Sequence, residues 1–180
     1  MKKYDCIFLD RDGTLNPDSG YINNIADFKF YDFTFSALKI MSKNNNRFCI
    51  ISNQSGVARG LIPINSLNTI NKFIRNKFSE NNISLLDIYM CFDHPDKPSC
   101  RRKPGPGMFL EAKKKYNLKL SNCLMVGDSI LDMKAGKNLG METMLVLTGK
   151  GKETLKNFRH SKSISYFADN IYEGSKRLCH

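Results

Sequence analysis

Residues 6–14 read Cys6-Ile7-Phe8-Leu9-Asp10-Arg11-Asp12-Gly13-Thr14, an apolar run that ends in two aspartates one residue apart. The run is short, rich in β-prone side chains and bounded by Gly13, which predicts a buried strand with acids at its carboxyl end. In an open α/β sheet that end faces the ligand crevice. Two carboxylates held together repel each other unless a cation or a shared proton compensates them. This stretch therefore predicts a metal-assisted catalytic site.

Outward from this stretch, strand-like and helix-like segments alternate along the chain. Further strands are expected at 47–52, 88–92, 123–128, 143–147 and 164–168, and helices at 35–43, 66–78, 107–116, 131–139 and 171–178. Such alternation predicts an α/β protein: a Rossmann-like three-layer α/β/α fold with a mainly parallel central sheet. Residues 16–31 are expected to form an irregular flap, and 93–106 a polar, proline-rich loop. No linker-like tract divides the 180 residues, so we expect a single domain, 1–180.

Composition narrows the function classes. No apolar run is long enough to cross a membrane, and the N-terminus enters a strand almost at once, so we expect a cytoplasmic protein without a membrane partner. The net charge of +11 would suit an anionic ligand. Because lysines alternate with asparagines throughout the chain, we favour compositional bias as the origin of this charge. No basic block is interleaved with aromatics, so we expect no nucleic-acid partner. Cys6, Cys49 and Cys123 lie in strand-like runs and are expected to be buried free thiols. Nothing requires more than a monomer.

Polar residues fall at the ends of the predicted strands. Asp10, Ser52 and Asp128 each terminate a strand, and the loop that holds Lys103 follows another. Right-handed crossovers place all four positions at the same edge of a parallel sheet. Packing alone gives no reason for this coincidence, so the four residues predict one site.

These motifs resemble the haloacid-dehalogenase-like (HAD) phosphatase superfamily over essentially the whole chain. The resemblance implies that Asp10 is the nucleophile, which forms an aspartyl-phosphate, and that Asp12 is the general acid and base. The neighbouring carboxylate would favour partial protonation of Asp12. Ser52 would bind the phosphoryl oxygens, and Lys103 would neutralise their charge. Mg²⁺ would be held by Asp10, the backbone carbonyl of Asp12, and Asp128. Asp132 could support the metal or Lys103, or be an exposed helical residue.

Within the superfamily, the chain resembles small phosphatases of the heptose-bisphosphate and histidinol-phosphate group, which have no large cap domain. The resemblance rests on the first motif, on residues 52–60, on residues 102–108 and on residues 125–128. It implies that Asn53, Gln54, Arg59 and Arg102 bind substrate, the arginines through the second phosphate or hydroxyls of a sugar bisphosphate. The implied reaction removes one phosphate from D-glycero-D-manno-heptose 1,7-bisphosphate. This sugar phosphate is a precursor of nucleotide-activated heptose for surface polysaccharides such as lipopolysaccharide.

Three other functions stay open from the sequence. One is histidinol-phosphate phosphatase, and another is a nucleic-acid 3′-phosphatase, whose phosphatase domains share a similar first motif. A third is a binding module that has kept the fold without catalysis, against which the intact acids argue.

A second metal is a separate matter. Many members of the group carry structural zinc in a C-x-H…C-x-C loop, but Asp93 replaces the histidine here, and Ser99 and Arg101 replace the later cysteines. Cys91, His94 and Cys100 could supply three ligands. Zinc is not predicted, because structural sites normally have four protein ligands.

Overall fold

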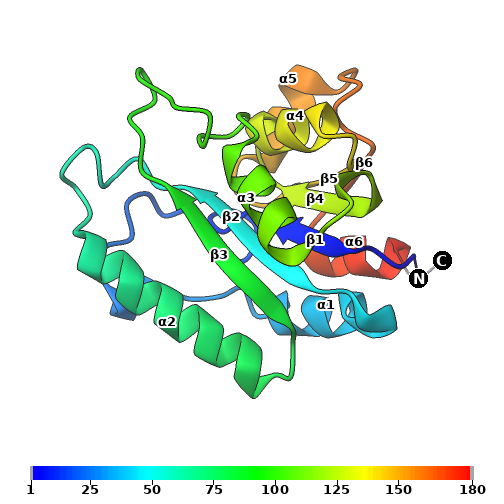
Figure 1. The fold of residues 1–180 in the computed structure, drawn as a ribbon, viewed down its shortest axis with the longest axis horizontal. Coiled ribbons are helices and arrows are strands. Elements are labelled where there is room, and N and C mark those ends of the chain that lie inside the picture. The colour runs from blue at the N-terminus through cyan, green and yellow to red at the C-terminus, as the bar shows by residue number, and fades with distance from the viewer. Residues whose placement is uncertain (1, 179–180) are drawn as a thin grey trace.

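A single parallel sheet forms the centre of the computed structural model, which describes residues 2–178 (Figure 1). Within these residues six strands pair in parallel in the order β3-β2-β1-β4-β5-β6. The strands are β1 (Cys6–Leu9), β2 (Phe48–Asn53), β3 (Leu85–Cys91), β4 (Cys123–Gly127), β5 (Glu142–Val146) and β6 (Tyr166–Ala168). The prediction of a mainly parallel sheet is confirmed.

Helices cover both faces of the sheet. They are α1 (Thr34–Met41), α2 (Ile64–Glu80), α3 (Gly107–Tyr116), α4 (Ile130–Asn138), α5 (Gly151–Phe158) and α6 (Ile171–Arg177), and short 3₁₀ turns are η1 (Ile25–Asp27), η2 (Lys43–Asn45) and η3 (Leu120–Asn122). One face packs against α1, α2 and α6, and the other against α3 and α4. Figure 1 shows α1 and α6 side by side on one side of β1, away from α4. This is the predicted three-layer α/β/α arrangement.

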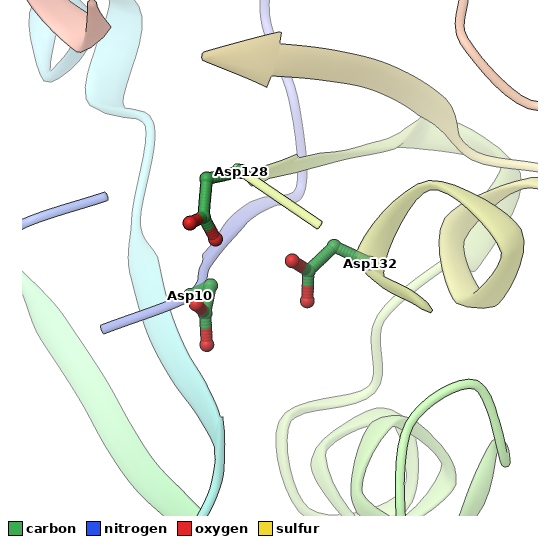
Figure 2. A group of neighbouring side chains, drawn as sticks. All are labelled: Asp10, Asp128 and Asp132. Atoms are coloured by element: carbon green, nitrogen blue, oxygen red, sulfur yellow. The ribbon is translucent and has the colours of Figure 1, made fainter. Parts of the chain in front are cut away.

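The topology places the predicted site residues at one edge of the sheet. Strand β1 lies between β2 and β4, and the chain reverses its direction of winding there, so a crevice opens at the carboxyl ends of these strands. Asp10 follows β1, Asp128 follows β4, and Ser52 lies next to the end of β2. Figure 2 shows Asp10 and Asp128 pointing into this crevice together with Asp132, which comes from α4.

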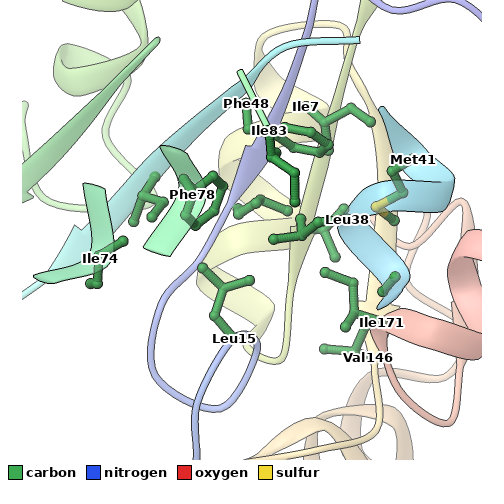
Figure 3. Packing of buried hydrophobic residues seen from close by; sticks show 14 of the residues in the cluster. Ile7, Leu15, Leu38, Met41, Phe48, Ile74, Phe78, Ile83, Val146 and Ile171 are labelled. Carbon is green, nitrogen blue, oxygen red and sulfur yellow. The ribbon is translucent and has the colours of Figure 1, made fainter. Parts of the chain in front are cut away.

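Alternating side chains of the inner strands build two apolar cores. Ile7 and Leu9 of β1 face α1, α2 and α6, whereas Cys6 and Phe8 face α3 and α4. Figure 3 shows the first core, in which Phe48 of β2 lies near Phe78 of α2 at a ring-centroid distance of 6.4 Å. Each fully buried large apolar side chain contributes roughly 1.5–3 kcal/mol. The cores fix the strands rigidly, and hence the acids at their ends.

The cysteines behave as small apolar residues in these cores. Cys6, Cys49 and Cys123 are buried as predicted, and the five cysteines that the structure describes have free thiols. The sixth, Cys179, lies outside the described residues.

Local differences from the expected elements have simple causes. Helix α2 begins at Ile64 rather than at Ser66, because the residue before it is Pro63, whose fixed φ of −63° suits the entry to a helix. Strand β3 begins at Leu85, three residues early, since pairing with β2 extends to Phe48. Helix α5 was not predicted, and its first residue is a glycine without a side-chain cap before it. Among residues 2–178, no helix is both long and apolar enough to cross a bilayer.

Candidate active site

Three aspartates meet at the carboxyl edge of the sheet (Figure 2). Asp10, Asp128 and Asp132 are all buried, and each offers an oxygen within 4.8 Å of the oxygens of the other two. Asp132 is also part of the start of α4, where its Oδ2 accepts a hydrogen bond from the Ser129 amide at 3.1 Å. The side chain that the sequence left with several possible roles is therefore a buried member of the cluster.

Lys103 enters this cluster from the loop after β3. Its Nζ donates to Asp10 Oδ1 at 2.6 Å and to the carbonyl oxygen of Ile51 at 2.8 Å, and lies 2.6 Å from Asp132 Oδ1. The ammonium group therefore makes two hydrogen bonds and two ion pairs, although the residue is only 4% exposed. Burial opposes the charge, but the carboxylates of Asp10 and Asp132 outweigh it and raise the pKa of Lys103. The ammonium group stays charged.

The acids are not fully compensated by this lysine. When all three carboxylates are ionised, one ammonium leaves two negative charges in a buried space. Burial, with the charge of Asp132, raises the pKa of Asp128 to about 7. Burial also raises the pKa of Asp10 well above its usual range, although Lys103 acts in the opposite direction. A divalent cation would balance the excess, and clustered carboxylate oxygens are the ligands Mg²⁺ takes. The donor set therefore fits Mg²⁺.

Asp12 lies in a different environment from Asp10. Its carboxylate accepts hydrogen bonds from Arg11, from Asn16 Nδ2 at 2.9 Å and from Gln54 Nε2 at 2.7 Å. The carboxylates gathered around Asp10 are those of residues 128 and 132, far away in the sequence. That a neighbouring carboxylate favours partial protonation of Asp12 stays a prediction. Its neighbours are donors, because the turn after β1 points residues 10 and 12 toward different partners.

The end of β2 supplies an ordered polar group. Ser52 is buried, and its Oγ accepts a hydrogen bond from Gln54 Nε2 at 2.8 Å. Asn53 is paired with the main chain of Lys103 in both directions, through Nδ2 to the carbonyl oxygen at 3.2 Å and through Oδ1 from the amide at 3.0 Å. This reciprocal pair fixes the loop that carries Lys103. The side-chain amides of Asn53 and Gln54 thus hold the Lys103 loop and the Ser52 hydroxyl in place.

The cluster opens into a cavity of about 480 Å³. Asp10, Asp12, Ser52, Asn53, Gln54, Arg102, Lys103, Asp128 and Asp132 all line it, together with Asp18, Gly20, Tyr21 and Lys150. The structure does not bring Arg59 to this cavity: the side chain is exposed in the turn after β2. Arg102 lines the cavity and donates to the Asp93 carbonyl oxygen at 3.2 Å. Of the two arginines expected to bind substrate, the structure places Arg102 at the site.

Close packing around Asp128 depends on a glycine. Gly13 has φ of +84°, and a Cβ built there would lie 2.1 Å from Asp128 Oδ2. Only glycine combines this backbone conformation with so small a volume. The glycine in the first motif therefore makes room for a carboxylate that arrives from β4.

Two residues of the site were missed by the sequence analysis. Lys150 donates its amide to Asp128 Oδ2 at 2.7 Å, and its Nζ lies 3.3 Å from Asp18 Oδ2. Asp18 belongs to the 16–31 flap, so this ion pair joins the flap to the rim of the cavity. No local pattern marks either residue, because the contact joins positions 132 residues apart in a loop and a flap.

The loop at 93–106 is shaped by hydrogen bonds. Asp93 Oδ2 accepts from the Ser99 amide at 2.7 Å. Cys91 is buried and Cys100 is exposed, and within residues 2–178 only the three clustered aspartates form a group of three or more possible metal ligands. The alternative of a zinc site at Cys91, His94 and Cys100 is therefore not supported. Asp93, which replaces the histidine of the zinc motif, instead stabilises the loop through its hydrogen bond with the Ser99 amide.

Comparisons with known proteins agree with this geometry. Residues 100–173 match the HAD-hydrolase-like family. The D-glycero-beta-D-manno-heptose-1,7-bisphosphate 7-phosphatase of Photorhabdus laumondii is 36% identical, over 82% of this chain and 83% of that protein. The D-glycero-alpha-D-manno-heptose-1,7-bisphosphate 7-phosphatase of Campylobacter jejuni is 34% identical, over 92% and 96%. The D,D-heptose 1,7-bisphosphate phosphatase of B. bronchiseptica, solved with magnesium and phosphate, superimposes with a TM-score of 0.88 at 28% identity, over 99% and 98% of the chains.

Proposed function

This chain belongs to the heptose-1,7-bisphosphate 7-phosphatase group of the HAD-like hydrolases, and on that premise we propose that it removes the 7-phosphate of D-glycero-D-manno-heptose 1,7-bisphosphate with Asp10 as nucleophile. The observation that carries this proposal is the buried contact of 2.6 Å between Lys103 Nζ and Asp10 Oδ1, beside two further carboxylates and at the wall of the cavity. A phosphoryl group that enters this cavity meets a carboxylate nucleophile and a fixed positive charge together.

Asp10 and Asp128 would hold Mg²⁺ with the backbone carbonyl of Asp12, and Asp132 is close enough to contribute or to fix Lys103. When bound, Mg²⁺ supplies positive charge that offsets the repulsion between the carboxylates and the anionic substrate. Lys103 and Ser52 supply the remaining stabilisation of the phosphoryl oxygens, since both line the cavity beside Asp10.

The first step transfers the phosphoryl group to the protein. A side-chain oxygen of Asp10 forms a bond to phosphorus, and the bond between phosphorus and the sugar oxygen breaks. The electron pair of the broken bond stays on the sugar oxygen, and Asp12 donates its proton there. The products of this step are the heptose monophosphate and an aspartyl-phosphate at residue 10.

The second step hydrolyses the aspartyl-phosphate. Asp12, now a carboxylate, takes a proton from a water molecule whose oxygen bonds to phosphorus. The bond between phosphorus and the oxygen of Asp10 breaks, the carboxylate is restored, and inorganic phosphate leaves. Each residue ends the cycle in the state in which it began it.

The rest of the substrate, beyond the phosphate that reacts, would be bound by residues at the rim of the cavity. Arg102 lies there and can pair with the second phosphate through a planar, bidentate group. Asn53 and Gln54 act by holding Lys103, Ser52 and Asp12. Arg59 would reach the substrate only with a movement of its turn.

We also propose that the chain works as one domain, as a monomer and in the cytoplasm. A single sheet with two cores joins all the strands, which supports the first point. The free thiols of the described cysteines suit a reducing compartment.

Phosphate release from both anomers of heptose 1,7-bisphosphate, with and without Mg²⁺, tests the proposal. Both anomers are needed because relatives named for each are 36% and 34% identical. Histidinol phosphate and a 3′-phosphorylated DNA end serve as the competing substrates. We expect Mg²⁺-dependent release of one phosphate per heptose bisphosphate, and none from D10N. Faster release from either competing substrate would refute the proposal.

A further inference from the structure

Arg11 lies between the two aspartates of the first motif and is buried, with 1% of its surface exposed. Its Nε donates to Asp12 Oδ1 at 3.0 Å, and its Nη2 donates to Asp12 Oδ2 at 2.8 Å. The guanidinium carbon lies 5.8 Å from the centre of the Phe28 ring. The planar group is thus held between a carboxylate and an aromatic ring that comes from the flap.

Burial of a charged side chain is costly unless it is paired, so this arrangement needs a reason. Arg11 makes two parallel hydrogen bonds to one carboxylate, a geometry that fixes the plane of the acceptor as well as its distance. The other donors to Asp12 each reach one of its oxygens and are shared: Asn16 also donates to the Pro17 carbonyl, and Gln54 to Ser52. Among the residues described, Arg11 alone donates hydrogen bonds to both carboxylate oxygens of Asp12.

We propose that Arg11 is a positioning residue that sets the plane of the Asp12 carboxylate for proton transfer to the leaving sugar oxygen. The inference rests on the proposed function, because it takes Asp12 as the general acid. Arg11 itself is not among the residues that line the cavity, so we infer that it acts through Asp12. The effect to be tested is on the proton that passes from Asp12 to the sugar oxygen while the bond from that oxygen to phosphorus breaks.

The need for this proton depends on the leaving group. An alkoxide is a poor leaving group and needs the proton, whereas p-nitrophenolate is a stable anion and leaves without it. The ratio of kcat/KM for heptose bisphosphate to that for p-nitrophenyl phosphate therefore measures the general acid alone. Because both substrates are turned over by the same preparation, a loss of folded protein lowers both values and leaves the ratio unchanged.

The experiment compares R11K and R11M with R47K as a matched control. Arg47 also donates through Nε and Nη2, but to the carbonyl oxygen of Asp5, and it does not line the cavity. Since general acid catalysis contributes about 10²–10⁴-fold, we expect R11M to lower kcat/KM for heptose bisphosphate by about 100-fold and that for p-nitrophenyl phosphate by less than about fivefold. R11K keeps the charge without the planar pair and should fall between R11M and the wild type. R47K should keep the ratio of the wild type.

D12N in the same assay separates this inference from the proposed function. A selective loss on heptose bisphosphate in both D12N and R11M supports the positioning role. A selective loss in D12N with an equal loss on both substrates in R11M overturns the role of Arg11 and leaves the proposed function standing. An equal loss on both substrates in D12N removes the general acid from residue 12, and the inference about Arg11 fails with it.

Discussion

The metal-free protein is expected to lose stability as the pH rises from 5 to 8, and Mg²⁺ is expected to restore it. Burial, together with the charge of Asp132, raises the pKa of Asp128 from 3.8 to about 7 in the folded state. In the unfolded chain the same carboxyl titrates near its ordinary value, so between these two values only the folded state holds the proton. The unfolded state then binds fewer protons, and the free energy of unfolding falls through this window and levels off above it.

The magnitude follows from the part of this window that the experiment covers. From pH 5 to about 7 the carboxyl keeps its proton in the folded state and has lost it in the unfolded state. This difference of one proton over about two pH units corresponds to ~3 kcal/mol at 1.36 kcal/mol per unit. For a chain of this size, each kcal/mol shifts Tm by about 2–4 °C, so Tm in EDTA should be about 6–12 °C lower at pH 8 than at pH 5. Asp10, whose pKa burial also raises, acts in the same direction.

The assay is thermal unfolding in EDTA and in excess Mg²⁺ at both pH values, with D128N as the matched variant. Asparagine is neutral and keeps an oxygen that can accept from the Lys150 amide, the bond of 2.7 Å in the wild type. D128N should therefore unfold at a higher temperature than the wild type at pH 8 in EDTA, and its Tm should depend less on pH and on Mg²⁺.

Asp87 does not contribute to this measurement. Burial opposes ionisation of Asp87, but hydrogen bonds from Lys115 and Arg75 lower its pKa to about 2, so its titration lies below the pH range used. A D128N protein no more stable than the wild type at pH 8 in EDTA would refute the reasoning. A wild-type Tm that changes with neither pH nor Mg²⁺ would also refute it.

Three further changes test other parts of the site. Lys103→Met removes the cation bound to Asp10 and should lower kcat by about 10²–10³-fold in a steady-state phosphate-release assay, whereas a decrease of less than tenfold would argue against its role in stabilising charge. Gly13→Ala places a Cβ against Asp128 and should raise the Mg²⁺ concentration for half-maximal activity about 10–100-fold; an unchanged Mg²⁺ titration would contradict the close packing. Asp18→Asn frees Lys150 for an anionic substrate and should lower KM by up to about fivefold with kcat unchanged, since exposed pairs are worth 0.2–1 kcal/mol; a higher KM would show that Asp18 binds the substrate itself.

The buried strands were readable from the sequence because a short apolar run is a local feature. The pattern at residues 6–9 fixes which side chains of β1 face each layer, and the same holds for β4. The order of strands and helices then sets a parallel sheet whose carboxyl ends share one edge. For this reason the positions of Asp10, Ser52 and Asp128 at that edge could be predicted before any coordinate was known.

Contacts between loops needed the tertiary structure. The sequence left Asp132 with several roles, placed Arg59 at the substrate and paired Asp12 with Asp10. The structure buries Asp132 against Lys103, which is one of the roles expected for it. It leaves Arg59 exposed and surrounds Asp12 with hydrogen-bond donors.

The physical reason lies in the range of the forces involved. Hydrophobic periodicity acts within an element and is written in consecutive residues, so the sequence by itself determined the layers, the sheet and the edge at which the acids lie. The orientation of a polar side chain depends on which loop, distant in the sequence, packs against it in the folded protein. Only the folded chain decided that Lys103 would form ion pairs with two of the aspartates and that Arg11 would hydrogen-bond to the acid beside it.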